Sequence, residues 1–141
     1  MNESALAVAE GRRNAIVFAY GAGKTGKSSL LFGPTGYAAM AVDIIFKEVR
    51  DQQVQVSFVD CILENVRDFA KYYKDKEHIN WEDITLEKIE KDSCEMKDNS
   101  DDPIQVRNLT RLDAYSYTGF MDLMRNQNEF RDKFDSALGI N

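Results

Sequence analysis

The stretch from Asn14 to Gly33 most constrains what this chain can fold into. Its first part, residues 15–20, is a short apolar run that predicts a buried strand. Its second part, Gly21 to Ser28, fits the pattern G-x-x-x-x-G-K-[ST] without a mismatch. A strand, a glycine-rich loop and a helix in this order bind phosphate, so the sequence predicts a fold of the α/β class.

The residue types in this loop suit a bound triphosphate. Glycine lacks a Cβ, so the backbone can turn with positive φ and bring its N–H groups close to phosphate oxygens. Lys27 is placed to reach the β- and γ-phosphates, and the hydroxyl of Ser28 can complete the coordination of Mg²⁺. A chance match is the alternative, and the expected strand before the loop and helix after it argue against chance. We therefore expect ATP or ADP with Mg²⁺, Ser28 as the metal ligand, and a binding loop of Gly21, Ala22, Gly23, Lys24, Thr25, Gly26, Lys27, Ser28 and Ser29.

Composition limits the other classes of function. A chain of 141 residues with 43% hydrophobic residues can bury a core of its own, most simply as one domain. Its formal net charge of −6 argues against a general nucleic-acid-binding protein. Cys61, Cys94 and the single His78 are too scattered for a zinc site, and Cys61 is expected to be a buried thiol. We find no signal peptide and expect no segment as apolar as a membrane span, which together indicate a cytosolic protein.

Two helices are expected in the first third of the chain. Residues 4–10 predict a short helix with Ser4 as its N-cap and Gly11 as its terminator. From Tyr37 to Arg50 the apolar residues recur at helical spacing and lie on one face. We expect this second helix to pack on a sheet.

A second strand is expected from Val54 to Asp60, where apolar and polar residues alternate before the run becomes fully apolar. Its last residue, Asp60, stands where a magnesium-binding aspartate of a nucleotide-binding protein could stand. The alternative, which we prefer, is an acid at the end of a strand that faces solvent or pairs with a neighbour. An apolar segment from Cys61 to Ala70 follows.

A charged insertion is expected at about residues 71–102. It holds eleven acidic residues against six lysines. One helix is predicted within it, from Asp83 to Lys97, with Leu86, Ile89 and Met96 on a thin apolar stripe. Trp81 is expected to anchor the insertion on the body of the protein, and the remainder to be a solvated, partly mobile excursion.

The last part of the chain predicts a strand at Ile104–Leu109 and a final helix. Ser116 or Thr118 can cap this helix. Its expected inner face, which belongs to the core and not to a cofactor site, consists of Phe120, Leu123, Met124, Phe130, Phe134 and Leu138.

Several of these segments resemble the kinesin motor domain. Residues 16–21, I-V-F-A-Y-G, are similar to the family's T-I-F-A-Y-G strand that leads into the nucleotide loop, and Gly33 matches the glycine that closes this segment. Residues 36–46 are similar to the start of the family's next helix, although Ala39 and Met40 replace the usual Pro-Arg. Residues 56–68 resemble V-S-[YF]-x-E-I-Y-x-E-x-[IV]-x-D-L-L, which places Asp60 where kinesins have a structural glutamate. Residues 106–110 resemble V-x-[GN]-L-T, and residues 120–131 the helix before switch I.

The resemblance covers only the first half of a motor domain. The chain contains no S-S-R-S-H or D-L-A-G-S-E switch segment, no R-x-R-P adenine-contacting segment, and none of the family's main microtubule-binding loops. Within the nucleotide loop, Ala22, Gly23 and Lys24 replace Gln, Thr and Gly, and Ser29 replaces an aromatic residue. Lys24 either adds phosphate attraction or crowds a turn that favours glycine. The switches position the attacking water, so we expect phosphate binding without turnover and assign no catalytic residue.

The resemblance implies a P-loop NTPase fold of the kinesin-motor type, a partial sheet flanked by helices. It implies an ATP-binding module that associates with microtubules, in the cytoplasm, on the cytoskeleton or in a cilium or flagellum. The alternative is a catalytically inactive, structural component of a microtubule or axoneme, and a small P-loop kinase is a third interpretation. Because an uncovered apolar strand invites pairing, we also expect a completing chain or a further segment to cover the sheet. No nucleic-acid or membrane partner is expected.

Overall fold

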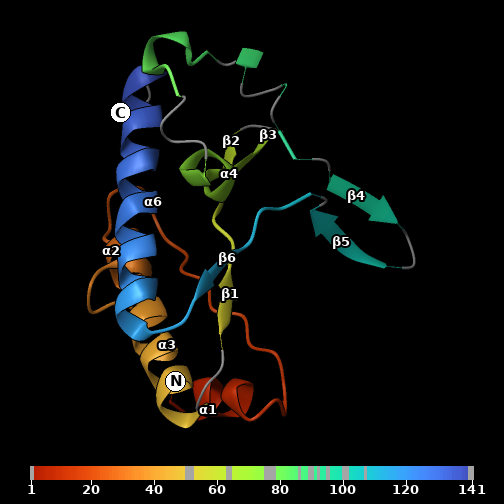
Figure 1. Ribbon diagram of the computed structural model, residues 1–141, viewed down its shortest axis with the longest axis vertical. Coiled ribbons are helices and arrows are strands. Elements are labelled where there is room, and N and C mark those ends of the chain that lie inside the picture. The colour runs from red at the N-terminus through yellow and green to blue at the C-terminus, as the bar shows by residue number, and fades with distance from the viewer. Residues whose placement is uncertain are drawn as a thin grey trace. The chain divides into compact units, whose positions relative to one another are not determined.

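A computed structural model describes residues 2–49, 53–62, 65–74, 79–85, 87–88, 91, 93–94, 96–99, 102–106 and 108–139. Its contacts group the chain into two compact units, one of residues 1–54 and 114–124 and the other of residues 55–113 and 125–141. Figure 1 labels the helices and strands of both units. The prediction of one domain with an insertion at residues 71–102 is not tested by this grouping and stays a prediction.

Helices dominate the first unit. They are α1 (Asn2–Ala9), α2 (Lys27–Phe32) and α3 (Tyr37–Glu48), joined by the first turns of α6 (Tyr117–Ala137). The main partners of α3 among the described elements are α1 and α2. Ala39 and Val42 of α3 are buried, as the helical spacing predicts. These contacts with helices do not test the expectation that α3 also packs on a sheet, which stays a prediction.

Glycines end or separate these helices. Gly11 adopts a φ of 67°, and its N–H donates to the carbonyl of Val8 at 2.9 Å, so the predicted terminator of α1 is confirmed. Ser4, in contrast, lies inside α1 and is not its N-cap. Between α2 and α3, a Cβ added to Gly33 would lie 2.4 Å from the carbonyl oxygen of Ser29. Only glycine fits there, which explains the glycine at this position in the kinesin-like pattern.

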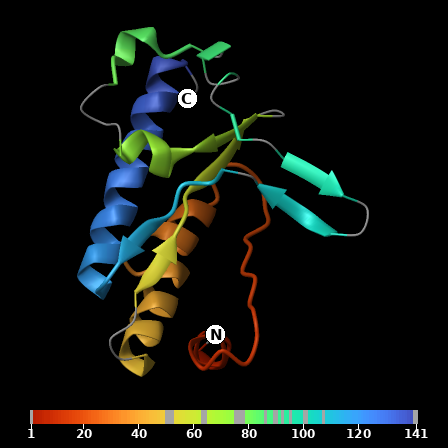
Figure 2. The ribbon, with the colours of Figure 1, turned by 45° about the vertical axis from the view of Figure 1, so that its right-hand side comes forward.

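Residues 15–20 do not form the predicted strand. They follow an extended path between α1 and the loop before α2 (Figure 2), and among the described residues no backbone hydrogen bond joins them to another segment. Ile16, Phe18 and Tyr20 are 90%, 81% and 96% exposed. A strand requires a paired neighbour, and the described strands pair only with one another. The prediction of a buried strand is therefore wrong for this structure.

One stretch of the described residues is apolar enough, by length and composition alone, to cross a membrane. Residues 27–48 contain an 18-residue window with a mean hydropathy of 1.4. The expectation that no segment reaches this level is therefore wrong. Only 11% of that window is buried, and Gly33 and Gly36 divide the stretch into α2 and α3.

The strands of the described residues form three two-stranded sheets. In the first sheet, β1 (Val54–Val56) pairs with β6 (Leu112–Ala114). In the second sheet, β2 (Val59–Ile62) pairs antiparallel with β3 (Asn65–Asp68). In the third sheet, β4 (Met96–Asn99) pairs antiparallel with β5 (Asp102–Val106). The mixture of helices and strands agrees with the α/β class. The described strands do not form the single partial sheet that was expected.

The predicted strand at residues 54–60 is divided in two. It stops after Val56, where the Ser57 hydroxyl donates to the carbonyl of Thr110 at 2.9 Å, and resumes as β2. Because β2 pairs antiparallel with β3, residues 59–62 and 65–68 are two paired strands and not one apolar segment. Cys61 is exposed on β2, so the expectation of a buried thiol is wrong. Strand pairing decides which side chains point outward, and the apolar run does not reveal it.

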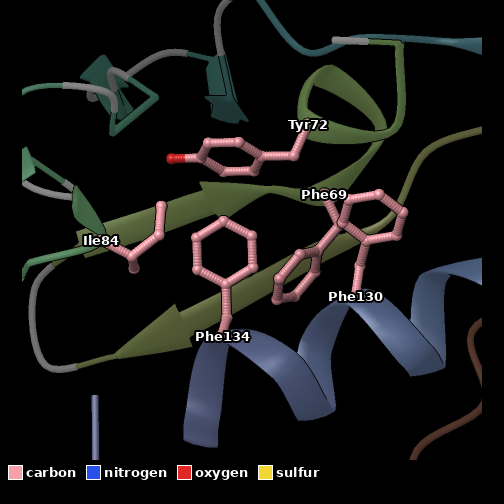
Figure 3. Close-up of a cluster of buried hydrophobic side chains, with 5 residues drawn as sticks. All are labelled: Phe69, Tyr72, Ile84, Phe130 and Phe134. Atoms are coloured by element: carbon pink, nitrogen blue, oxygen red, sulfur yellow. The ribbon is translucent and has the colours of Figure 1, made fainter. Parts of the chain in front are cut away.

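An aromatic cluster forms the core of the second unit (Figure 3). Phe134, with an exposed fraction of 0%, lies at its centre and packs against Phe69, Tyr72 and Ile84. The ring centroids of Tyr72 and Phe134 are 4.6 Å apart. Phe69 and Tyr72 come from α4 (Phe69–Lys74), and Phe130 and Phe134 from α6. The inner face predicted for the last helix is thus confirmed at Phe130 and Phe134.

The expected insertion contributes to this core. The ring of Trp81, in the short 3₁₀ helix η2 (Trp81–Asp83), lies 5.3 Å from the ring of Phe134, which confirms Trp81 as an anchor. Because Tyr72 and Ile84 are buried, the prediction of a solvated excursion is wrong for this part. The predicted helix at residues 83–97 is wrong at both ends, since Asp83 belongs to η2 and β4 begins at Met96. Leu86 and Ile89 lie outside the described residues.

Near the end of the chain, the structure agrees with the features that the local sequence predicts. The strand expected at residues 104–109 is observed as β5, residues 102–106. Asn108 adopts a φ of 59°, a left-handed conformation that asparagine and glycine tolerate best, in agreement with the [GN] position of the kinesin-like pattern. The Ser116 hydroxyl accepts the N–H of Gly119 at 3.1 Å, so Ser116 caps α6 as predicted.

Candidate nucleotide-binding loop

The loop from Gly21 to Ser28 turns sharply into α2. Gly26 precedes the helix with φ 82° and ψ 10°, a left-handed conformation, and its carbonyl accepts the N–H of Leu30 at 2.9 Å. A Cβ at Gly26 would meet nothing within 4 Å. Glycine is therefore required here by the backbone dihedral angle and not by crowding. This turn places Lys27 and Ser28 in the first turn of α2.

Lys24 also adopts a left-handed conformation, with a φ of 60°. The Cβ of a non-glycine residue meets the following carbonyl in this region, at a cost of roughly 1–2 kcal/mol. The kinesin pattern has glycine at this position. The sequence left two roles open for Lys24, and the backbone shows that the residue stands in a turn that favours glycine.

The ammonium group of Lys27 is directed back over the loop. It donates to the carbonyl of Ala22, and its Nζ lies 3.4 Å from the hydroxyl of Thr25. The Thr25 hydroxyl donates to the same carbonyl at 2.8 Å. Because a lysine has three N–H donors, one donor remains for another acceptor. Lys27 is thus held over the loop, where a phosphate group would meet it.

Ser28 and Ser29 are exposed at the start of α2. Among the described residues, no protein group forms a hydrogen bond with the Ser28 hydroxyl, which is therefore open to a ligand. The donor set of this loop, the ammonium groups of Lys24 and Lys27, three hydroxyls and backbone N–H groups beside glycines, fits a phosphate group. A single hydroxyl also fits a Mg²⁺ ion that takes its other oxygens from water and phosphate. No group of three histidine, cysteine or carboxylate side chains gathers elsewhere in the described part of the chain.

Asp60 is not arranged as a metal ligand. It lies within β2, opposite Arg67 of β3, and its carboxylate pairs with the guanidinium of Arg67. The preferred interpretation, an acid that pairs with a neighbour, is confirmed.

The sequence did not single out Arg67 and Asp68, which organise the second unit. Arg67 is 2% exposed and also contacts the carboxylate of Asp135 at 3.3 Å. The carboxylate of Asp68 accepts the N–H groups of Ala70 at 3.0 Å, Lys71 at 3.2 Å and Thr110 at 2.6 Å. The sequence feature that could have identified Asp68 is the aspartate of the V-x-D-L-L pattern, which Asp68 matches. Its role is structural, because it caps α4 and fixes the segment before β6.

A glycine-rich turn that leads through Gly26, Lys27 and Ser28 into a helix is the arrangement of the P-loop class of nucleotide-binding proteins. The comparison with protein families makes the assignment more specific. The model of the kinesin motor domain matches residues 4–138, nearly the whole chain. The chain therefore belongs to the kinesin motor domain family. Searches among curated proteins and among solved structures gave no match.

Proposed function

We propose that residues 21–29 bind ATP or ADP with Mg²⁺, as the nucleotide module of a kinesin-like protein. The observation that supports this most is the left-handed turn at Gly26, which delivers Lys27 and Ser28 to the first turn of α2. Lys27 would hold the β- and γ-phosphates, Ser28 the metal ion, and the N–H groups of the loop the remaining phosphate oxygens. The bound metal would supply charge neutralisation.

Titration with a fluorescent ATP analogue tests this proposal. We expect Lys27→Ala to weaken binding roughly 10- to 100-fold, the effect of losing one hydrogen bond to a charged group. Ser28→Ala should remove the dependence on Mg²⁺. Lys88→Ala, which removes an exposed lysine from another part of the chain, is the control and should bind normally. Absence of binding by the wild type at millimolar nucleotide would count against the proposal.

We assign no turnover to these residues. The chain carries no segment that matches either switch, and phosphoryl transfer requires groups that position the attacking water. The second candidate function is accordingly that of a kinesin-like module with a structural role on microtubules. Membership of the family supports microtubules as the partner and the cytoskeleton as the location.

Cosedimentation with microtubules separates the two candidates. Binding that is indifferent to ATP, ADP or the absence of nucleotide supports the structural role. Release that depends on nucleotide and is lost in Lys27→Ala supports a motor-type module.

We further propose that another segment or chain completes the fold around residues 15–20. Their exposed apolar side chains and unpaired backbone support this. Slow amide exchange at residues 15–20 in the isolated monomer, which would show that their backbone is already paired, would contradict it.

A further inference from the structure

The segment of residues 14–20 has two different faces. Ala15 and Val17 line an apolar groove of about 270 Å³ together with residues of α1, α2 and α3. Ile16, Phe18 and Tyr20, the alternate positions, are the most exposed large apolar side chains of the described residues. Both faces of the extended segment are exposed, since Val17 is itself 55% exposed, but the face of Ile16, Phe18 and Tyr20 is almost bare.

The backbone of this segment is also open. Its N–H and C=O groups make no backbone hydrogen bond with any other described residue, so both edges are available for a neighbouring strand. An extended backbone with free edges and alternating side chains is the type of site to which another strand adds. The bare apolar face provides further contact area for the incoming chain.

The charge around the segment indicates what kind of strand can pair with it. Residues 11–42 contain four cationic side chains and no acidic one, in a chain of net charge −6. Arg12 and Arg13 precede the segment, and Lys24 and Lys27 follow it. Arg12 is paired with Glu10, whereas Arg13 and Lys24 make no ion pair with the described residues. Each end of the open segment is thus positively charged.

A second copy of the chain is a poor occupant for this site. Antiparallel pairing of residues 14–20 about Val17 would place Arg13 of each copy opposite Gly21 of the other, three residues from Lys24, and parallel pairing in register would place like charges opposite each other. Like charges on directly opposed strand positions are destabilising. The charge pattern selects a different sequence.

We propose that residues 14–20 accept a strand from a partner polypeptide whose apolar core is flanked at both ends by acidic residues. The apolar core would pair with residues 15–20 and cover Ile16, Phe18 and Tyr20, while the acids would meet Arg13 and Lys24. A run of seven extended residues spans roughly 23 Å, so the two acidic ends would stand about six to eight residues apart. This inference rests on the proposed completion of the fold and shares only Lys24 with the proposed nucleotide loop.

Fluorescence anisotropy with the 141-residue chain and labelled peptides of about ten residues tests the inference. One peptide has the core Thr-Val-Thr-Val-Thr-Val flanked by glutamates, and its matched control has the same core flanked by lysines. At low salt we expect the acidic peptide to bind at least about tenfold more tightly, with a smaller difference at about 0.5 M salt. The double variant Arg13→Glu with Lys24→Glu should reverse the preference, and Lys88→Glu should leave it unchanged.

Proline variants test whether the backbone is the site. Neighbouring N–H groups of a strand point to opposite edges, so Val17→Pro and Phe18→Pro block different edges, and one of them should abolish binding. Phe18→Thr, which favours a strand, should retain at least part of the binding. Because the segment makes no backbone hydrogen bond, circular dichroism should show the proline variants folded.

The results of these binding experiments distinguish the proposed partner from the alternatives. Equal binding of the two peptides would overturn the charge requirement, and no binding of either would overturn the inference together with the proposed completion. Dimers in sedimentation that disappear in Phe18→Pro would show a second copy as the occupant and overturn the choice of partner. Ser28→Ala, which should lose Mg²⁺-dependent nucleotide binding, should still bind the acidic peptide.

Discussion

Lys24 occupies a backbone conformation that is costly for any residue with a Cβ. Its φ of 60° carries a strain that glycine would not have. We expect Lys24→Gly to be about 0.5–1 kcal/mol more stable than Lys24→Ala, because both variants lack the ammonium group and only one retains a Cβ. Urea unfolding measures this difference. Equal stability of the two variants would mean that the loop relaxes without cost.

Asp68 connects three backbone groups through one carboxylate. Asp68→Ala should lower the free energy of unfolding by about 2–4 kcal/mol, since it removes the cap of α4 and leaves the Thr110 N–H without its acceptor. Asp68→Asn should cost less, because the amide oxygen can still accept. Asp132→Ala, at an exposed position beside Arg131, should change stability by less than about 0.5 kcal/mol. A small effect of Asp68→Ala would show that these contacts are not needed for the fold.

The two cysteines should differ in reactivity. Burial raises the pKa of the Cys94 thiol, Asp68 raises it further and Lys71 partly opposes this, whereas Cys61 is exposed. Iodoacetamide near neutral pH should therefore modify Cys61 first, as mass spectrometry of Cys61→Ala and Cys94→Ala would show.

The raised pKa of Cys94 also predicts a dependence of stability on pH. The folded state disfavours the thiolate, so its contribution to stability is complete below the ordinary thiol pKa of about 8.5 and is lost as the pH rises through the higher folded value. Cys94→Ala should remove this decline, and Cys61→Ala should retain it.

At the scale of elements, the aromatic cluster joins α4, η2 and α6. Phe134→Ala should cost about 3–5 kcal/mol, the usual effect of deleting a buried ring. A double-mutant cycle with Trp81→Ala should give a coupling of about 0.5–1.5 kcal/mol, because the two rings meet edge to face. Additive effects would mean that residues 81–83 do not belong to this core.

Helices and their ends could be predicted where the residues that determine them lie close together in the sequence. The N-cap at Ser116, the glycine after α1 and the helical spacing of α3 all act within one or two turns, and the structure confirms them. The division of residues 54–62 into β1 and β2 depends on Thr110, far along the chain, so the pattern of apolar residues did not reveal it. The pairing of Arg67 with Asp135 joins residues that are even farther apart in sequence.

At the scale of the whole molecule, we expect the rate of amide hydrogen exchange to differ strongly between segments of the chain. Amides of residues 14–20, which make no backbone hydrogen bond, should exchange with solvent deuterium at rates close to those of an unfolded peptide. Amides in the middle of α6 should be strongly protected, since this helix carries Phe130 and Phe134 into the core. Addition of the acidic peptide should slow exchange at residues 14–20 alone, and early protection of these residues without it would argue that they are already paired.

The sequence by itself predicted the turn at Gly26 that leads into α2, because a glycine followed by lysine and serine at the start of a helix is a local arrangement that needs few distant residues. It also determined the family, since the motifs keep their order over residues 4–138. Only the tertiary structure decided the state of residues 15–20. An apolar run has the composition of a buried strand, but a strand forms only where another backbone supplies its hydrogen bonds, and the described residues supply none here.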